Sequence, residues 1–144
     1  MRFITIDHAQ EGMIVGRPLR GRNGEILLTR RAFDPSKGKL DLPGGFIDLD
    51  ETAEDAVRRE VKEELNLDVT SMQYIGSSPN RYSYGGLVYF TLDLGFKCTV
   101  VDFDDLRADD DVDGFLFLPP HSINMQEIAF PSIQNILQMV ITAN

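Results

Sequence analysis

The sequence is poor in the residues that build several common functional sites. Its 144 residues include one cysteine, Cys98, two histidines and no tryptophan. A single cysteine excludes an internal disulfide and a cysteine-based zinc site, and it fits a reducing cytosol. His8 and His121 show neither metal-ligand nor catalytic-triad spacing, so we assign them no role. Cys98 lies within an expected strand, and we interpret it as a small buried hydrophobe.

Long apolar runs and basic clusters are also missing. No apolar stretch approaches the ~20 residues that span a membrane, and the start MRFITIDHAQEG lacks the segments of a signal peptide. We therefore expect a cytoplasmic protein with no membrane partner. The net charge of −9 opposes binding to nucleic-acid polymers, because such binding relies on clustered Lys and Arg. An anionic substrate would need a cation in its site, and a divalent metal is the obvious candidate.

The length and residue pattern of the sequence indicate one α/β domain over residues 1–144. Alternating apolar residues and turn signals predict strands at 24–30, 39–42, 86–94, 96–101 and 115–118. Helical periodicity predicts one helix at 52–65 and a second from Pro131 to Ile141. The first twenty residues show no clear pattern. We expect a central β-sheet with a helix on each side.

The expected helix at 52–65 contains a conflict between charge and burial. Its apolar face consists of Ala53, Ala56, Val57, Val61 and Leu65. Glu60 and Glu64 fall within that face, and Glu63 lies at its edge. Like charges four residues apart destabilise a helix, and burying an unpaired carboxylate costs several kcal/mol more. Either a basic side chain from elsewhere pairs with these glutamates, or a divalent cation held by oxygen ligands lies there.

The turn before this helix favours the cation. Pro43-Gly44-Gly45 exposes backbone carbonyl and amide groups, and glycine allows the backbone to approach a ligand closely. Carbonyl oxygens and carboxylates together are a magnesium-type ligand set, which substrate phosphates and water would complete.

Residues 45–67 resemble the Nudix box, the signature of the MutT-like nucleoside-diphosphate-X hydrolases. That signature is Gly, five residues, Glu, seven residues, then Arg-Glu-aliphatic-any-Glu-Glu-any-Gly-aliphatic. The matching residues of this chain are Gly45, Glu51, Arg59, Glu60, Val61, Glu63, Glu64 and Leu67. Asn66 stands where the family has Gly. Because Asn also adopts positive φ at helix ends, we expect the C-cap to survive.

The resemblance covers roughly residues 24–142 and implies the Nudix fold, an α/β/α sandwich around a mixed β-sheet. It also implies hydrolysis of the pyrophosphate linkage of a nucleoside diphosphate joined to another moiety X, with Mg²⁺ or Mn²⁺ as cofactor. Carried over by position, Glu60 and Glu64 are expected metal ligands, and Glu63 is a ligand or general base. Either Glu63 or Glu60 would take the proton of the attacking water.

Further roles follow from the same resemblance. The carbonyl of Gly44 would complete the protein ligands to the metal. Glu51 and Arg59 would pair and hold the Gly45 loop against the helix. An arginine after the second strand often contacts a substrate phosphate in this family, and of Arg30 and Arg31 we favour Arg31.

The chain is most similar to the NADH-pyrophosphatase branch but lacks that branch's substrate motif. Residues 77–83 read SSPNRYS, where that branch has Ser-Gln-Pro-Trp-Pro-Phe-Pro, and the cysteines of its zinc ribbon are absent. We therefore do not assign NADH. A non-catalytic nucleotide-sensing Nudix domain is the alternative function. Isopentenyl diphosphate isomerase chemistry, which uses this fold with an added cysteine, is a further alternative that the position of Cys98 disfavours.

Two other features admit two interpretations each. The acidic stretch from Asp102 to Asp113 is either a solvated loop or the source of an extra metal ligand, and its partial EF-hand spacing fails at Pro120. The tyrosines Tyr82, Tyr84 and Tyr89 either pack on the sheet or stack on a base or ribose.

Overall fold

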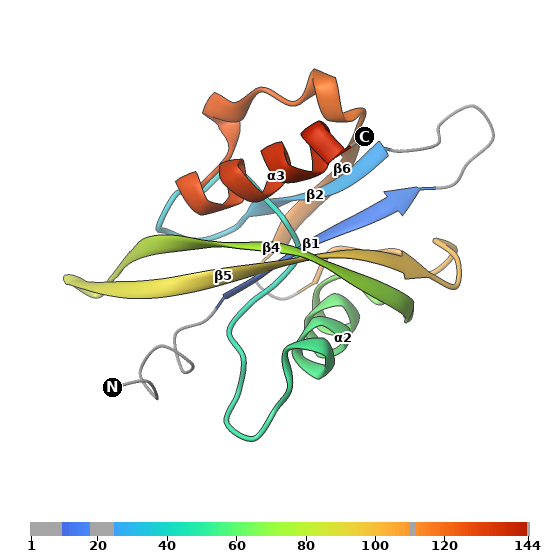
Figure 1. Cartoon of the computed structure of the whole chain (residues 1–144), viewed down its shortest axis with the longest axis horizontal. Helices are drawn as coiled ribbons and strands as arrows, with labels where there is room; N and C mark the ends of the chain where they lie inside the picture. The colour runs from blue at the N-terminus through green and yellow to red at the C-terminus, as the bar shows by residue number, and fades with distance from the viewer. Residues whose placement is uncertain (1–9, 18–24, 110–111, 144) are drawn as a thin grey trace.

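The computed structural model describes residues 10–17, 25–109 and 112–143. Within them, a mixed sheet lies between two α-helices, as Figure 1 shows. The strands are β1 (Gln10–Arg17), β2 (Glu25–Arg31), β3 (Leu40–Asp41), β4 (Val69–Tyr84), β5 (Leu87–Val100) and β6 (Val112–Leu118). The helices are α2 (Ala53–Leu65) and α3 (Pro131–Ala143), and two short 3₁₀ turns, η1 (Pro120–Ser122) and η2 (Met125–Glu127), precede α3.

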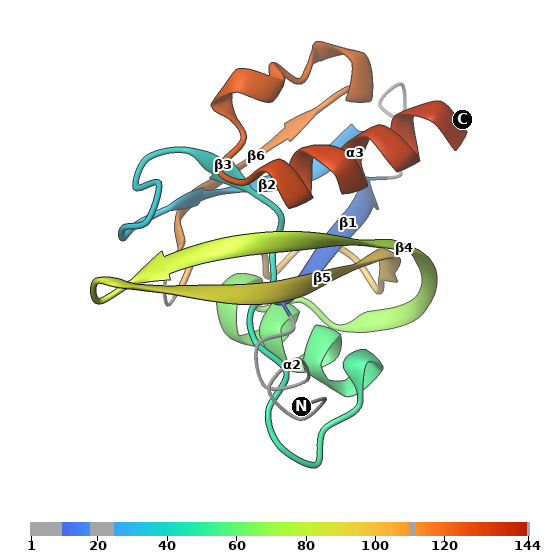
Figure 2. The same ribbon diagram turned by 60° about the vertical axis from the view of Figure 1, so that its left-hand side comes forward.

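The sheet is mixed because one of its pairings is parallel. The strand order is β3-β2-β1-β5-β4, with β6 paired to β2. β1 runs parallel to β5, whereas the other pairings are antiparallel. Figure 2 shows α3 on one side of the sheet and α2 on the other. The expected α/β/α sandwich around a mixed sheet is therefore confirmed.

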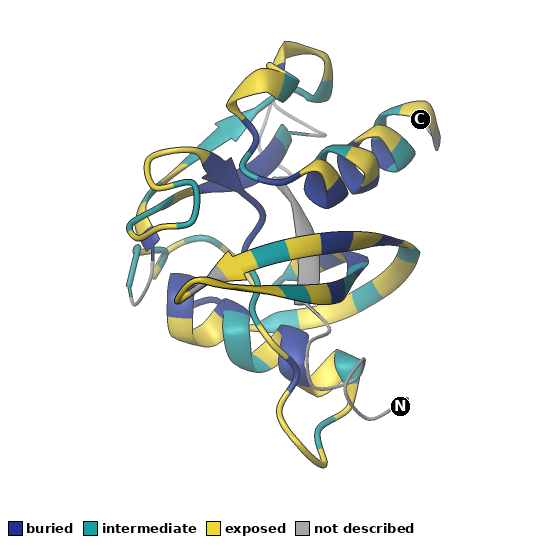
Figure 3. Ribbon diagram, turned by 90° about the vertical axis from the view of Figure 1, so that its left-hand side faces the viewer, coloured by how far each residue is buried: buried dark blue, intermediate teal, exposed yellow. Residues whose placement is uncertain are grey.

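The alternation of side chains along β2 explains the two layers. Ile26 and Leu28 pack in the core on the α3 side, and Leu27 packs in the core on the α2 side. Successive strand residues point to opposite faces, so an uninterrupted apolar run serves a strand that is buried on both faces. Figure 3 shows that both helices turn their buried residues toward the sheet.

The long β4–β5 hairpin differs from the expectation. We predicted no strand at 69–84, yet β4 pairs with β5 along its whole length. The Gly85-Gly86 turn joins them, with φ of 60° and 80°, the geometry that two-residue hairpin turns require. Pro79 is tolerated because β4 is an edge strand. The expected strands 86–94 and 96–101 are one strand, and Gly95 in its middle lets Ile136 of α3 approach.

The ends of the other elements differ by a few residues. β1 occupies part of the N-terminal segment that showed no pattern, and β6 begins three residues before the expected strand at 115–118. Gly24, the first residue of the expected strand at 24–30, and His8 lie outside the described residues. Within the described part of the chain, neither helix is long and apolar enough to cross a membrane.

A buried polar cluster fixes the start of α3 against the sheet. The Ser132 hydroxyl donates a hydrogen bond to Asp93 Oδ2, and Asn135 Nδ2 donates to Ser78 Oγ at 3.0 Å. Asp93 is fully buried, and its Oδ1 has no hydrogen-bond partner among the residues that the structure describes. Burial raises the pKa of Asp93 to about 7, and the nearby Asp41 carboxylate adds to the increase.

Candidate active site

Helix α2 begins and ends where its capping residues predict. The Thr52 side chain accepts a hydrogen bond from the Asp55 amide at 3.0 Å, which satisfies one of the free N–H groups of the first turn. Asn66 adopts the left-handed conformation, with φ of 57°, and its amide donates to Lys62 O. The expectation that Asn66 replaces the family's C-cap glycine is therefore confirmed.

The glutamates of α2 lie where the helical spacing predicts. Ala56, Val57, Val61 and Leu65 are fully buried. Glu64 is buried among them and 7% exposed. The side chain of Glu60 is 15% exposed and that of Glu63 is 46% exposed. Exposure therefore increases from Glu64 through Glu60 to Glu63.

Arg59 connects the box loop to these glutamates. Its Nε and Nη2 atoms donate to the two carboxylate oxygens of Glu51 at 2.8 and 2.9 Å, and Nη2 also reaches the Phe46 carbonyl at 3.0 Å. Its Nη1 atom lies 2.7 Å from Glu60 Oε1 and 3.4 Å from Glu63 Oε2. This paired geometry is the strong form of a charge-assisted hydrogen bond. The Arg59 hydrogen bonds lower the pKa of Glu51 to about 2, and those to Glu51 and Glu60 raise the pKa of Arg59.

The two glycines of the turn bring the backbone against the glutamates. The backbone amide of Gly44 donates a hydrogen bond to Glu64 Oε1 at 2.8 Å. A Cβ atom at Gly45 would lie 2.5 Å from Glu60 Oε1. Only glycine leaves room for the Glu60 carboxylate at this distance from the loop, which gives the box glycine a physical reason.

The donor chemistry of the site fits a divalent cation. Glu60, Glu63 and Glu64 supply carboxylate oxygens within one turn, and the loop backbone lies beside them. Within the described residues, no group of three or more Asp, Glu, His or Cys side chains is arranged so that it could hold a metal ion. The Arg59 guanidinium lies 2.7 Å from Glu60 Oε1 and 3.4 Å from Glu63 Oε2, so a basic side chain pairs with these two carboxylates.

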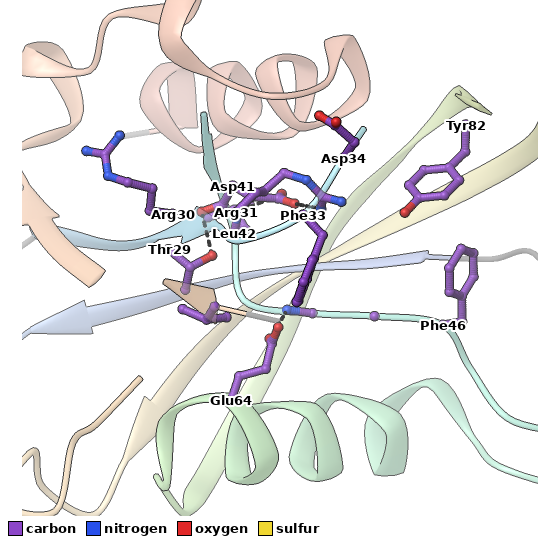
Figure 4. Close-up of a pocket in the computed structure, with 13 residues that line it drawn as sticks. Thr29, Arg30, Arg31, Phe33, Asp34, Asp41, Leu42, Phe46, Glu64 and Tyr82 are labelled. Atoms are coloured by element: carbon purple, nitrogen blue, oxygen red, sulfur yellow. Dashed lines mark hydrogen bonds and ion pairs between the residues drawn. The ribbon is translucent and has the colours of Figure 1, made fainter. Parts of the chain in front are cut away.

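A pocket opens from Glu64 toward the β2–β3 loop. Its volume is about 270 Å³, and it is lined by Thr29, Arg30, Arg31, Phe33, Asp34, Asp41, Leu42, Gly44, Gly45, Phe46, Glu64, Tyr82 and Val112. Figure 4 shows Glu64 reaching up from α2 toward the turn, with the arginines and aromatic rings around the space above it. The box is therefore continuous with a cavity that a substrate could enter.

Arg31 is held firmly in the wall of this pocket. Its Nη1 atom lies 3.0 Å from Asp41 Oδ2, and its Nε donates to Pro35 O at 2.7 Å. Its guanidinium lies over the Phe130 ring, 4.9 Å from the centroid. Burial raises the pKa of Asp41, while the Arg31 charge opposes that increase. Arg30 also lines the pocket, but its Nη1 donates to Gly38 O at 2.7 Å on the exposed side.

The described part of the acidic stretch lies against the end of α2, and Asp110 and Asp111 lie outside the described residues. The acidic loop docks by its backbone, because the Arg107 and Asp109 amides donate to Leu65 O and Glu64 O at the end of α2. The Asp109 carboxylate pairs with Arg107. Cys98 is buried in the core on the α2 side, as expected.

The structure describes the side chains of two of the three tyrosines. Tyr82 lines the pocket and packs on Phe130 and Phe46. Tyr89 is half-buried opposite Tyr82 on β5, and the side chain of Tyr84 lies outside the description.

Asp41, Phe33 and Phe46 are among the pocket residues that the sequence analysis did not single out. Asp41 is buried between two leucines in the run Leu40-Asp41-Leu42, and a charge inside an apolar run was the available signal. Phe33 and Phe46 are exposed aromatic residues whose shared cavity only the tertiary structure reveals.

Residues 12–138 match the family model described as NUDIX domain. This match covers α2 with the box, the first eight residues of α3 and nearly the whole sheet. The chain belongs to the Nudix family.

Curated Nudix relatives match over part of their length. An ADP-ribose pyrophosphatase of Methanocaldococcus jannaschii is 43% identical over 77 residues, which is 51% of this chain and 46% of that protein. The NAD-capped RNA hydrolase NudC of Haemophilus influenzae is 36% identical over 74 residues, 50% of this chain and 28% of that protein. The matches thus span less than half of these relatives.

Solved structures share the fold. The NUDIX domain of Shewanella oneidensis NrtR, solved in complex with ADP ribose, superimposes with a TM-score of 0.74 at 19% identity. The superposition covers 94% of this chain and 88% of that one. The observed sandwich is therefore the Nudix fold.

Proposed function

We propose that this Nudix domain hydrolyses the pyrophosphate linkage of a nucleoside diphosphate joined to a second moiety. The observation that carries the proposal is the arrangement of the Nudix-box side chains. Three carboxylates on one turn of α2, Glu60, Glu63 and Glu64, stand beside a pocket, and the Arg59–Glu51 pair fixes the loop that faces them. The names of the relatives, a pyrophosphatase and a capped-RNA hydrolase, agree with this class of reaction.

The proposed cofactor is Mg²⁺ or Mn²⁺. The residues that would hold it are Glu60, Glu63, Glu64 and the Gly44 carbonyl, a hard oxygen set of the kind these ions prefer. When bound, the ion supplies charge neutralisation on the phosphate oxygens and lowers the pKa of water. Arg59 bonds Glu60 and Glu63 in the structure, so we propose that it orients these side chains when the ion is absent.

We assign proton transfer and substrate binding to side chains of the protein. Glu63 or Glu60 takes the proton of the attacking water, a contribution that is typically ~10²–10⁴ in rate. Glu63 is the more exposed of the two, so a water can reach it directly. Arg31 donates from the pocket wall to the substrate, since its pairing with Asp41 and its packing on Phe130 hold it in place. The products are two phosphomonoesters when the substrate is a nucleoside diphosphate sugar.

Glu64 is the residue that tests this proposal most simply. Phosphatase-coupled phosphate release should be measured with Mg²⁺ on ADP-ribose, NADH, diadenosine polyphosphates, (d)NTPs and CDP-alcohols. Wild type should hydrolyse at least one of them, and Glu64→Gln should lose that activity. Glu54→Gln is the matched control, because Glu54 is an exposed glutamate of the same helix. No hydrolysis of the panel, together with tight nucleotide binding, would favour the alternative, a nucleotide-sensing Nudix domain.

The proposed setting is the cytoplasm, and the proposed partner is a small nucleotide-type molecule. A net charge of −9 and a single buried cysteine support this.

A further inference from the structure

A buried hydrogen bond joins the start of helix α3 to the sheet. Ser132 lies in the first turn of α3 and Asp93 lies on β5; both are fully buried, and the Ser132 hydroxyl donates to Asp93 Oδ2. Further along α3, Ile133, Ile136 and Leu137 pack in the apolar core on this side of the sheet. Hydrophobic contact is non-directional, whereas a hydrogen bond requires a particular distance and angle. The Ser132–Asp93 bond therefore fixes where α3 begins more closely than its apolar face does.

Polar atoms around this bond are buried without partners. Asn80 Nδ2, Thr91 Oγ1 and Asp93 Oδ1 have no hydrogen-bond partner within the described part of the chain. Asn80 lies opposite Thr91 in the β4–β5 hairpin, and the alternation along β5 places Thr91 on the same face as Asp93. Burying a polar group without a hydrogen bond costs free energy that apolar residues of similar size would not cost. Stability alone does not explain a carboxyl group here, which favours a positional role.

Phe130 immediately precedes α3 and belongs to its first turn. The Gln134 amide donates to the Phe130 carbonyl at 3.1 Å. Pro131, whose ring fixes its own φ, is the one residue between Phe130 and Ser132. Few torsions therefore remain by which the Phe130 ring could move independently of Ser132.

The Phe130 ring supports the guanidinium of Arg31 in the pocket wall. The guanidinium carbon lies 4.9 Å from the ring centroid, and Arg31 Nη1 lies 3.0 Å from Asp41 Oδ2. Figure 4 shows Arg31 beside Asp41 at the pocket. A guanidinium above an aromatic face is attracted by the quadrupole of the ring, so its place depends on where the ring lies. A shift of Phe130 would therefore loosen Arg31.

We propose that Asp93 is a positioning residue for substrate binding. Through Ser132 it fixes Phe130, and the Phe130 ring in turn holds the guanidinium of Arg31. This inference rests on the proposed function, in which Arg31 donates to the substrate. Asp93 is not among the residues that line the pocket, so it acts only through these neighbours. Losing the connection should weaken substrate binding and leave proton transfer at the α2 glutamates almost unchanged.

Ser132→Ala tests the connection without any substrate. Protons above an aromatic ring resonate upfield, so the Arg31 Nε–H signal in ¹H–¹⁵N spectra reports the place of Arg31 over Phe130. Arg31→Lys identifies the signal by its loss, and Phe130→Leu gives its position without the ring. Ser132→Ala should move the signal toward that of Phe130→Leu and speed its exchange with solvent. Asp93→Asn keeps an oxygen that accepts from Ser132 and should retain the wild-type signal.

Two control variants separate this connection from a general loosening of α3. Thr91→Val removes a buried hydroxyl whose oxygen has no partner among the described residues. Asn135→Ala removes a second polar link between α3 and β4, the bond from Asn135 Nδ2 to Ser78 Oγ at 3.0 Å. Both variants should leave the Arg31 signal in place.

Steady-state kinetics on a panel substrate that is hydrolysed test the consequence for binding. Ser132→Ala should raise KM about 3-fold to 10-fold, part of what a hydrogen bond to a charged group contributes, and change kcat by less than about 2-fold. Asp93→Asn, Thr91→Val and Asn135→Ala should keep the wild-type KM.

An Arg31 signal that Ser132→Ala leaves unchanged, or that Asn135→Ala disturbs equally, would overturn the positioning role. Hydrolysis with a KM that Ser132→Ala does not raise would also overturn it, while leaving the proposed function in place. A signal disturbed by Ser132→Ala alone, without hydrolysis of any panel substrate, would support the connection from Asp93 to Arg31 and contradict the proposed function.

Discussion

One added methyl group at Gly45 separates the stability of the fold from the arrangement of the site. In Gly45→Ala, the new Cβ would lie 2.5 Å from Glu60 Oε1, 2.6 Å from its carboxyl carbon and 2.8 Å from Oε2. Ordinary van der Waals contact begins at 3.4 Å, so the carboxylate must retreat by about 0.9 Å. Glu60 can do so because its carboxylate is the end of a flexible side chain.

The cost to stability should be small. The retreat weakens the bond between Glu60 and Arg59, but Arg59 keeps its two bonds to Glu51. Replacing glycine by alanine also lowers the entropy of the unfolded chain, which offsets part of that loss. We expect the free energy of unfolding to change by less than about 1 kcal/mol.

The cost to activity should be large. A displacement of about 1 Å in a positioned group can cost on the order of 10²-fold in rate. We therefore expect Gly45→Ala to lower kcat by about 10²-fold and to weaken Mn²⁺ binding, with an almost unchanged Tm. Kinetics, calorimetry with Mn²⁺ and thermal melting measure the three quantities.

Gly76→Ala is the control. Its Cβ would lie 2.6 Å from Met139 Sδ, also a flexible side chain, but one that belongs to α3, across the sheet from α2. It should change Tm about as much as Gly45→Ala and leave kcat unchanged. If Gly45→Ala kept wild-type kcat, or lost most of its stability, the reasoning about the Glu60 carboxylate would be refuted.

Three further predictions concern single carboxylates. Glu64→Gln should weaken Mn²⁺ binding in calorimetry and leave the metal-free Tm unchanged or raised; a large fall in that Tm would show that Glu64 is a structural ion-pair member. Glu51→Gln should lower kcat moderately and respond to excess metal, whereas Glu63→Gln and Glu60→Gln should each cost ~10²–10⁴ without rescue; equal, unrescued losses would contradict this division. Asp93, with its pKa raised to about 7, keeps its proton in the folded state while the unfolded chain ionises near pH 4. Because the folded state holds this proton more tightly, we expect the free energy of unfolding to fall by up to about 4 kcal/mol as pH rises from about 4 to 7. Denaturant titrations should show this fall in wild type and not in Asp93→Asn.

Local patterns were enough to predict the elements that carry the box. The spacing of Val57, Val61 and Leu65 fixes the buried face of α2, and Thr52 and Asn66 mark its ends. These signals depend on neighbouring residues only, so tertiary context does not alter them. The position of Glu60 and Glu64 on that face follows from the same geometry.

Long-range structure was harder to predict. β4 contains Gly76, Ser77, Ser78 and Pro79, residues that usually mark turns, and it forms a strand because β5 pairs with it throughout. The pocket gathers Phe33, Asp41 and Tyr82 from distant segments, and no local pattern joins them. Arg31 was favoured for a phosphate contact, but its pairing with Asp41 and its packing on Phe130 could be seen only in the fold.

Hydrolysis of ADP-ribose in H₂¹⁸O tests the central claim most directly. Wild-type protein with Mg²⁺ should yield AMP and ribose 5-phosphate, with one ¹⁸O atom in only one of the two phosphates, as mass spectrometry would show. Glu54→Gln should give the same products at a similar rate, and Glu63→Gln should give almost none. Absence of these products for ADP-ribose and for every other member of the substrate panel, or their formation at an undiminished rate by Glu63→Gln, would contradict the claim that the α2 carboxylates catalyse pyrophosphate hydrolysis.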